Sequence, residues 1–413
     1  MDPIDLFDPA TQEDWYPTYD RMRTECPAFQ MPGTATYVLT RYDDVHRVLR
    51  RPERFPNGSG TKALLSSPAA RAYWDEHGWK KSTPLGTNPP IHRHYRAMID
   101  GFFDAAGARK ARPMIIAVAN RLLDGWEGRR ELDYIADFAL PLPVEVITRL
   151  IGFDVADIPQ LKVWSTAWVM PFAMNLTDDE QMYVAEQGVA FQRYIHEVAS
   201  QRRVDPADDV LSHLVHTPFH DPDLDVERPL EDWEIINIVD HLYIGGNETT
   251  TFALASGVWL LSRNPDVEAR LRADPSLIPE FVEEVLRLES PTQGLFRLSA
   301  DDADFGDTMA PAGSTLHVRY GAANRDPEMF RCPAVLDLDR ANKRRHVAFS
   351  VGEHLCPGAE LSRTEQAVAH DLLLQRVVGL RVSPENDFRH LPGFILRALT
   401  QLQVTYDNVR PAG

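Results

Sequence analysis

The sequence predicts a mainly α protein with a minor β part, and three observations support this. The chain has 413 residues, of which 44% are hydrophobic, and this is ample for a large core. Capped helical patterns recur along it, and the longest cover about residues 232–262 and 357–380. No Gly/Ser linker, repeat or low-complexity tract divides the chain, so we expect residues 1–413 to form a single domain.

Shorter elements are expected on either side of these helices. Residues 35–40 read as a strand after a Pro-Gly turn, and further strand pieces are expected near residues 316–318 and 402–405. A helix is expected to start after Asn88-Pro89-Pro90, and another helical stretch covers residues 281–288. The β part is therefore expected to be assembled from segments that lie far apart in the chain.

Charge and the N-terminal residues exclude several classes of function. The net charge of −18 disfavours nucleic acid and anionic membrane surfaces as partners. Residues 1–5 are acidic and contain no apolar run, so they resemble neither a signal peptide nor a membrane anchor. We expect a soluble, cytoplasmic protein.

Cys356 has the most informative surroundings in the chain. Phe349 lies seven residues before it, Gly352 four before it and Gly358 two after it. Pro357 suits the first position of the helix that follows, which would place Cys356 at the N-cap. There the helix dipole and free N–H groups favour the thiolate, the form that binds metals. The pattern indicates a soft ligand for a metal cofactor, with glycines that let the backbone approach a flat partner.

A buried structural cysteine at a tight turn is the alternative interpretation of this position. Cys26 and Cys332 are the other cysteines, and no C-x-x-C pair exists, which argues against a zinc site and a disulfide framework. A single protein thiolate fits haem ligation, because the porphyrin supplies the other four bonds.

The helix predicted over residues 232–262 carries an interruption at Gly245-Gly246. A glycine there lets a flat cofactor lie against the helix, and Thr249 is placed to return its hydroxyl to the carbonyl of Gly245. Glu248 is a carboxylate among apolar residues, which is costly unless it is paired or hydrated. The functional interpretation is a groove that handles oxygen, and the alternative is a kinked core helix packed through its glycines.

The motif Phe349-x-x-Gly352-x-x-x-Cys356-x-Gly358 resembles the haem-binding signature of the cytochrome P450 superfamily. The chain resembles the soluble bacterial members over nearly its whole length. The resemblance implies a single, triangular cytochrome P450-like fold that binds haem b (iron protoporphyrin IX) with Cys356 as the iron ligand. It also implies that Phe349, Gly358 and Gly245 contact the cofactor.

The resemblance assigns roles to charged residues as well. Haem carries two propionates, which need cationic or hydrogen-bonding partners. Four residues match propionate-contacting positions in the family, although each alone is also ordinary at a surface: His92, Arg96, Arg297 and His354. Glu284 and Arg287 resemble the family's structural Glu-x-x-Arg element, which supports the loop before the thiolate, and Arg325 is the expected third partner.

Apolar and aromatic residues in several segments are expected at the substrate. In the family, the region matching residues 51–91, which here includes Leu64, covers the substrate, and an apolar cluster runs from Trp164 to Met174. The side chains expected to contact the substrate are Val169, Phe172, Tyr243, Ile244, Leu295, Phe296, Phe394 and Ile395. The lining indicates a hydrophobic small molecule, and terpenoid, aromatic, fatty acyl and steroid classes all remain open.

The function implied by the resemblance is that of a haem-thiolate monooxygenase using O2. Glu248 and Thr249 match the family's acid–alcohol pair, which delivers protons and hydrogen-bonds the oxygen. Electrons from NAD(P)H are expected through separate proteins, a ferredoxin and its reductase, and Lys343-Arg344-Arg345 is a candidate docking patch or simply a solvated charge run. The rivals are a peroxide-dependent or non-oxygenase haem-thiolate enzyme of the same fold and a non-catalytic haem sensor.

Overall fold

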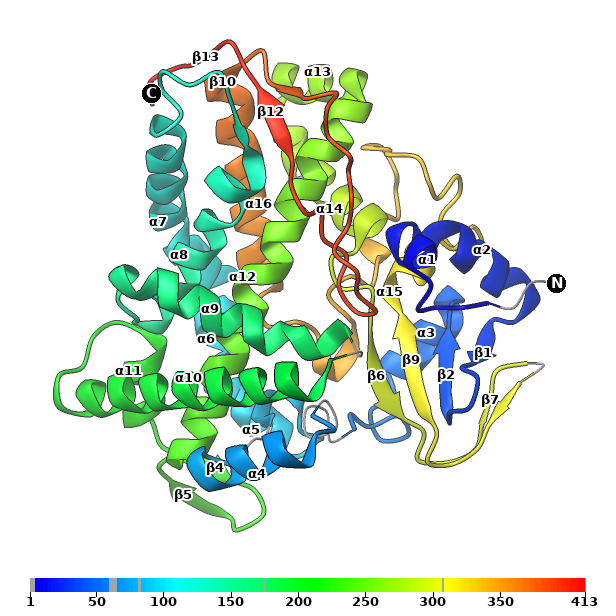
Figure 1. Ribbon diagram of the computed structural model, residues 1–413, viewed down its shortest axis with the longest axis vertical. Coiled ribbons are helices and arrows are strands. Elements are labelled where there is room, and N and C mark those ends of the chain that lie inside the picture. The colour runs from blue at the N-terminus through cyan, green and yellow to red at the C-terminus, as the bar shows by residue number, and fades with distance from the viewer. Residues whose placement is uncertain (1–3, 59–64, 81–82, 174–175, 307, 413) are drawn as a thin grey trace.

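Helices form the larger part of the molecule, and a smaller β region lies at one side (Figure 1). The computed structural model describes residues 4–58, 65–80, 83–173, 176–306 and 308–412. The α-helices are α1 (Pro9–Glu13), α2 (Trp15–Glu25), α3 (Tyr42–Leu49), α4 (Pro68–His77), α5 (Ile91–Ala97), α6 (Asp100–Phe103), α7 (Ala105–Asp124), α8 (Pro141–Ile151), α9 (Ile158–Val169), α10 (Asp178–Val204), α11 (Val210–His216), α12 (Asp232–Arg263), α13 (Pro265–Ala273), α14 (Ile278–Glu289), α15 (Tyr320–Ala323) and α16 (Ala359–Arg376). Short 3-10 or π-helical segments are η2 (Pro84–Gly86), η3 (Ile135–Ala139), η4 (Val155–Asp157), η5 (Met170–Ala173), η6 (Pro275–Leu277), η7 (Lys343–Arg345) and η8 (Gly352–His354).

The strands are short and pair across long stretches of sequence. They are β1 (Ala28–Gln30), β2 (Thr36–Leu39), β3 (Glu131–Asp133), β4 (Phe219–Asp221), β5 (Val226–Arg228), β6 (Gly294–Leu298), β7 (Ala303–Asp304), β8 (Met309–Ala310), β9 (Thr315–Arg319), β10 (Val377–Val378), β11 (Arg381–Val382), β12 (Gln403–Thr405) and β13 (Asn408–Val409). The main sheet has the order β1-β2-β9-β6, in which β2 and β9 are parallel and the other pairs antiparallel. The prediction of a mainly α protein with a minor β part is confirmed.

Helix α12 crosses the middle of the molecule and packs against α8, α10, α14 and α16 (Figure 1). It starts with a capping box in which Glu231 and Glu234 bond each other's backbone N–H groups. The helix is continuous through Gly245 and Gly246, so the predicted interruption is wrong. A Cβ on Gly246 would lie 2.9 Å from Ile147 of α8, whereas a Cβ on Gly245 would meet open space. One glycine therefore allows close helix packing, and the other leaves one face of the helix open.

The other predicted elements lie close to their expected bounds. Residues 35–40 contain β2, residues 281–288 lie within α14, and β9 and β12 contain the two further strand pieces. Helix α4 and η2 lie within residues 51–91, the segment expected to cover the substrate. Within the described ranges, no helix combines the length and the apolar character that crossing a membrane requires.

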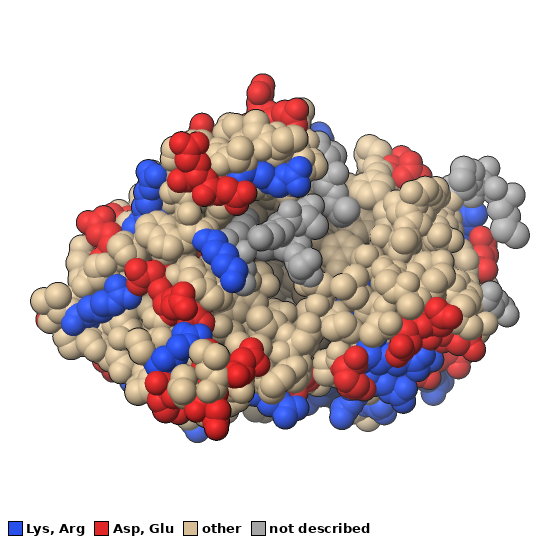
Figure 2. Space-filling model, turned by 90° about the horizontal axis from the view of Figure 1, so that it is seen from below, with Lys and Arg blue, Asp and Glu red and all other residues tan. Residues whose placement is uncertain are grey.

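The face of the molecule seen from below carries basic and acidic side chains close to one another (Figure 2). Lys and Arg are interspersed with Asp and Glu there, and no extended region of positive charge forms on this face.

Candidate active site

The loop before α16 holds Cys356 by backbone contacts. The Cys356 N–H donates to the carbonyl of Phe349 at 2.9 Å, which closes the loop between them. Gly352 has a φ of +78°, a conformation that strains any other residue, and a Cβ there would lie 3.1 Å from the carbonyl oxygen of Leu49. Helix α16 begins at Ala359 with Gly358 as its N-cap, so the prediction of Cys356 at the N-cap is wrong by two residues.

The surroundings of Cys356 favour the neutral form of its thiol. Burial raises its pKa, while a hydrogen bond from the Gly358 N–H and the charges of Arg96 and Arg363 lower it without outweighing burial. The expected lowering of this pKa by the helix start is therefore not seen. A metal ion bound to sulfur deprotonates a thiol outright, so a thiolate at this position requires one.

The Glu284–Arg287 pair is completely buried and fastens the chain that leads to the cysteine loop. The Arg287 guanidinium donates to both oxygens of Glu284, at 2.6 and 2.9 Å, and to the carbonyls of Asn324, Pro333 and Val335. The third partner is Arg340, whose Nε lies 3.1 Å from Glu284, and the prediction of Arg325 is wrong. Arg325 instead pairs with Glu289 at the end of the same helix.

Two further contacts carry this support into the cysteine loop. The side chain of Asn324 accepts from the N–H of Val347 at 2.7 Å and donates to Ser290 at 2.8 Å. Glu283 accepts from Arg363 of α16 at 2.7 Å and bonds His346 at 3.0 Å. Burial alone would raise the pKa of Glu283, but these two partners lower it to about 2. Sequence reasoning missed Glu283, although it stands directly before Glu284.

A cluster of basic side chains lies beside the cysteine loop, where Glu353 pairs with His92 and Asp100 pairs with Arg96. The imidazoles of His92 and His354 have centroids 4.3 Å apart, and the buried Nε2 of His92 has no hydrogen-bond partner among the described residues. Burial, followed by the charges of His92 and Arg297, lowers the pKa of His354 to about 3. Arg96 donates to Asp100 and to the carbonyl of Leu355. The four predicted propionate contacts are thus brought together, and their chemistry fits a dianionic group.

Helix α12 presents an accessible stripe on an otherwise buried surface. His241, Gly245, Thr249 and Phe252 are not buried, although nearly every residue between them is. They recur at intervals of three and four residues, so they share one face of the helix. The hydroxyl of Thr249 donates to the carbonyl of Gly245 at 3.0 Å, as predicted. Thr250 faces α16 instead and bonds Ser362 at 3.0 Å.

Glu248 is not free beside Thr249. Its carboxylate accepts from Lys162 and, at 2.8 Å, from Ser165, both on α9. The charge is therefore paired at the contact between α9 and α12, which explains how a carboxylate that is only 5% exposed is tolerated. The sequence held no local signal for Lys162, because the two residues are 86 positions apart.

The predicted substrate contacts separate into several groups. Phe172, Phe296, Phe394 and Ile395 come together in one apolar cluster beside α1 and α2, and the ring of Phe296 packs on His317 and Phe394, on the opposite face of β6 from Arg297. Leu295, on the Arg297 face, is 38% exposed. Val169 ends α9 and is half-buried.

The other predicted contacts lie in closed packing. Tyr243 and Phe394 have no exposed surface, so neither lines an open cavity, and for them the prediction is wrong. The ring of Tyr243 lies against Phe153 and Phe191, across the helix from Gly245. Ile244 and Ile395 are almost as fully buried. Leu64 and Met174 lie outside the described residues.

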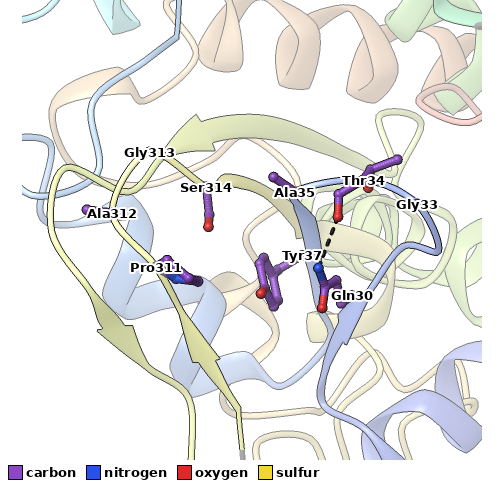
Figure 3. Close-up of a pocket in the computed structure, with 9 residues that line it drawn as sticks. All are labelled: Gln30, Gly33, Thr34, Ala35, Tyr37, Pro311, Ala312, Gly313 and Ser314. Atoms are coloured by element: carbon purple, nitrogen blue, oxygen red, sulfur yellow. Dashed lines mark hydrogen bonds between the residues drawn. The ribbon is translucent and has the colours of Figure 1, made fainter.

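A separate hollow of about 520 Å³ lies at the edge of the β region (Figure 3). The turn after β1 and the turn before β9 line it, and Gln30 donates to the carbonyl of Thr34 across its rim. Its lining shares no residue with the cysteine loop or with α12 and carries no charged side chain. We therefore assign the chemistry to Cys356 and not to this hollow.

The fold and the cysteine loop fit a haem-thiolate protein, because an accessible glycine on the central helix, a single cysteine in a glycine-bordered loop and a group of basic side chains lie together. The family model for cytochrome P450 matches residues 155–397. The chain therefore belongs to the cytochrome P450 family, whose members are monooxygenases that carry haem b with thiolate ligation.

Relatives of known name resemble the chain over almost its whole length. It is 35% identical over 409 residues to Cytochrome P450 107B1 of Saccharopolyspora erythraea, with 96% of each chain covered. It is 32% identical over 404 residues to nocardicin C N-oxygenase of Nocardia uniformis subsp. tsuyamanensis, covering 95% of this chain and 96% of that protein. The solved structure of P450BioI in complex with hexadec-9Z-enoic acid ligated acyl carrier protein has a TM-score of 0.85 and 29% identity, covering 96% of this chain and 100% of that chain.

Proposed function

We propose that the protein inserts one oxygen atom from O2 into a hydrophobic small organic substrate, by hydroxylation, epoxidation or dealkylation. The 413 residues act as one domain, and the electrons come from NAD(P)H through a ferredoxin and its reductase. The observation that carries this proposal is the accessible hydroxyl of Thr249 on the helix that packs against α16, directly behind the Cys356 loop. An alcohol at this place is needed to handle O2, whereas a protein that only binds haem has no use for it.

Haem, bound through Cys356, supplies the redox chemistry that activates O2 and transfers the oxygen atom. Cys356 would hold the iron through its sulfur, and Gly245 would leave room for the flat macrocycle beside α12. His92, Arg96, Arg297 and His354 would contact the two propionates.

Thr249 and Glu248 manage protons in this proposal. The Thr249 hydroxyl rests on the carbonyl of Gly245 and can turn to donate to oxygen held in the open stripe. Glu248 occupies the next position along the helix and is bound to Lys162, whose side chain is 29% exposed. This ion pair links the protein surface to the neighbourhood of Thr249, so Glu248 relays protons when it exchanges Lys162 for water.

The substrate remains a class and not a compound. Relatives act on different molecules, because one is named an N-oxygenase of nocardicin C and another was solved with a fatty acid on a carrier protein. What this chain offers is an apolar lining with the half-buried Val169 and the exposed Leu295, together with the open stripe of α12. We infer a hydrophobic small molecule that lies along α12.

The test uses the haem-loaded enzyme with a ferredoxin, its reductase and NADPH. Hydrophobic compounds are first screened for a shift in the spin state of the iron, since a bound substrate displaces the water ligand. Compounds that bind are then turned over in isotopically labelled O2. One labelled oxygen atom in the product is the expected result. Turnover with hydrogen peroxide but none with O2 and reductant would assign the protein to the peroxide-dependent class instead.

A further inference from the structure

Two polar rings face each other where α9 meets α12, at the far end of the open stripe. His241 begins the stripe, one helical turn before Gly245. Trp168 lies near the end of α9, and the two ring centroids are 6.2 Å apart in an edge-to-face arrangement. Phe172 also packs edge-on against the indole of Trp168, with centroids 5.6 Å apart. This pair is therefore a polar spot in an otherwise hydrophobic region.

Each of the two rings has a buried nitrogen without a hydrogen-bond partner among the described residues. The indole Nε1 of Trp168 and the Nδ1 of His241 are both buried and have no partner among the residues that the structure describes. A buried donor without an acceptor costs free energy, and buried polar groups in folded proteins are normally paired. On the same two helices Lys162, Ser165 and Glu248 satisfy one another, whereas Trp168 and His241 lie side by side and both keep an unpartnered nitrogen. The unmade bonds at Trp168 and His241 thus call for a ligand.

The chemistry of the two rings selects the ligand atom. Burial lowers the pKa of His241, so the imidazole is neutral at pH 7 and has one N–H to donate. The indole of Trp168 is a donor only. The two rings lie in contact, with centroids 6.2 Å apart, so a single ligand oxygen that approaches beside them can be shared by their two nitrogens. Two neutral donors suit a neutral acceptor, such as a carbonyl or a hydroxyl oxygen. A carboxylate would need a cation, and none is paired with either ring among the described residues.

We propose that Trp168 and His241 recognise a neutral oxygen, a carbonyl or a hydroxyl, on the substrate. The inference rests on the proposed function and narrows its substrate class to hydrophobic molecules that carry such an oxygen. Eight residues separate His241 from Thr249, which corresponds to about 12 Å along the helix axis. A substrate anchored at this pair therefore presents for oxidation an atom on the order of 10 Å from its anchoring oxygen.

The test compares methyl decyl ketone with dodecane, which has almost the same shape and no oxygen. Affinities for the haem-loaded enzyme are measured by equilibrium dialysis and by the spin-state shift. We expect the wild type to prefer the ketone by about tenfold, the usual worth of one or two well-placed hydrogen bonds. Trp168→Phe and His241→Phe each keep an aromatic ring but remove the donor, and each should reduce the preference severalfold while dodecane binds as before.

Trp164→Phe is the matched control, because Trp164 lies on the same helix as Trp168 and its ring is stacked on Phe191. It should leave the preference for the ketone unchanged. Equal affinities for ketone and alkane in the wild type, or equal losses for both ligands in Trp168→Phe and His241→Phe, would overturn the proposal. Tighter binding of dodecanoate than of the ketone would also overturn it, since that result requires a cation at this place.

Dialysis separates this inference from the proposed function. Binding that depends on Trp168 and His241, without any oxygenated product, supports the recognition site and refutes the monooxygenase reaction for this ligand. Oxygenation of the ketone near its carbonyl would refute the anchoring and leave the reaction intact. Hydroxylation toward the far end of the decyl chain is the result that both proposals expect.

Discussion

Cys356 is the residue on which cofactor binding depends. Replacing it with histidine keeps a ligand to iron but removes the thiolate, whose electron donation shifts the absorption of the reduced carbon monoxide complex. Cys356→His should therefore lose the red-shifted Soret band of that complex, measured by difference spectroscopy. Cys332→Ser is the control, because Cys332 is an exposed free cysteine, and it should retain the band. A red-shifted band in Cys356→His would remove Cys356 as the ligand.

Thr249 supplies the hydroxyl of the open stripe. Thr249→Ala should divert electrons from product to hydrogen peroxide, and coupling should fall by about tenfold if one hydrogen bond of roughly 1.4 kcal/mol is lost. The measurement is the ratio of product formed to NADPH consumed. Thr250→Ala removes a neighbouring hydroxyl that bonds Ser362, so it should cost about 1 kcal/mol of stability and leave coupling unchanged. Unchanged coupling in Thr249→Ala would exclude this hydroxyl from proton transfer.

Residues with local signals were the ones that could be predicted. The spacing of residues around Cys356 was enough to identify the cysteine loop. The hydrogen bond between Thr249 and Gly245 follows from helical geometry alone. The partners of Glu248 could not be predicted, because Lys162 is brought to it only by the packing of α9 on α12. Tyr243 was misplaced for the same reason: an aromatic residue near a glycine pair can face either side of a helix, and here it faces the core.

Helix α14 acts as an element that clamps two parts of the chain through adjacent acids. Glu284 holds Arg287 and Arg340, whereas Glu283 holds His346 of the cysteine loop and Arg363 of α16. The sequence predicted that Glu284 and Arg287 support the loop before the cysteine. It could not identify Arg340, because the chain between α15 and α16 has almost no regular structure and its path depends on these same contacts.

The Glu283 clamp makes stability depend on pH. Because the folded pKa is about 2 and the usual value is 4.5, the carboxylate contributes stability above pH 4.5 and loses it as pH falls toward 2. The full contribution is about 3 kcal/mol. Glu283→Gln should lower the free energy of unfolding at pH 7 by about this amount. The difference from wild type should shrink below pH 4.5, as measured by urea unfolding of the haem-loaded protein followed by circular dichroism.

Glu280→Gln is the control on the same helix. Glu280 is partly exposed, and its partner Lys343, although buried, also bonds the carbonyls of Leu338 and Arg340, so the loss of Glu280 should cost less than about 1 kcal/mol. If both variants lost the same free energy of unfolding at pH 7, the buried contacts of Glu283 would stabilise the protein no more than the partly exposed contacts of Glu280.

At the scale of the whole molecule, the sequence predicted the class of fold because long amphipathic helices and a signature loop are local patterns. It predicted the start of α16 two residues too early, since Pro357 can precede a helix as well as begin it. It placed no contact between β2 and β9, although these strands pair in parallel across more than half of the chain. Such pairings depend on how the intervening chain packs, and neither strand carries a local sequence pattern that identifies its partner.

The net charge of −18 restricts where an acidic ferredoxin can dock on the molecule. An acidic partner approaches such a molecule only where positive charge is exposed. Within the predicted patch, Lys343 is buried and bonded to Glu280, and Arg344 lies beside Glu280 and Glu283. Among the described residues of this patch, Arg345 is therefore the exposed cation that forms no ion pair with an acid. Arg345→Glu should slow reduction by ferredoxin by about tenfold at low ionic strength, and salt should reduce the effect.

The measurement for Arg345→Glu is the stopped-flow rate of haem reduction in the presence of carbon monoxide, at two salt concentrations. Substrate affinity should not change, because a rim charge alters the rate of encounter and not the pocket. Arg193→Glu, an exposed charge reversal on α10, applies the same change in net charge at another element and should leave the rate almost as it was. If both variants slowed reduction equally, total charge would govern the encounter. A rate in Arg345→Glu equal to the wild type would place the docking surface elsewhere on the molecule.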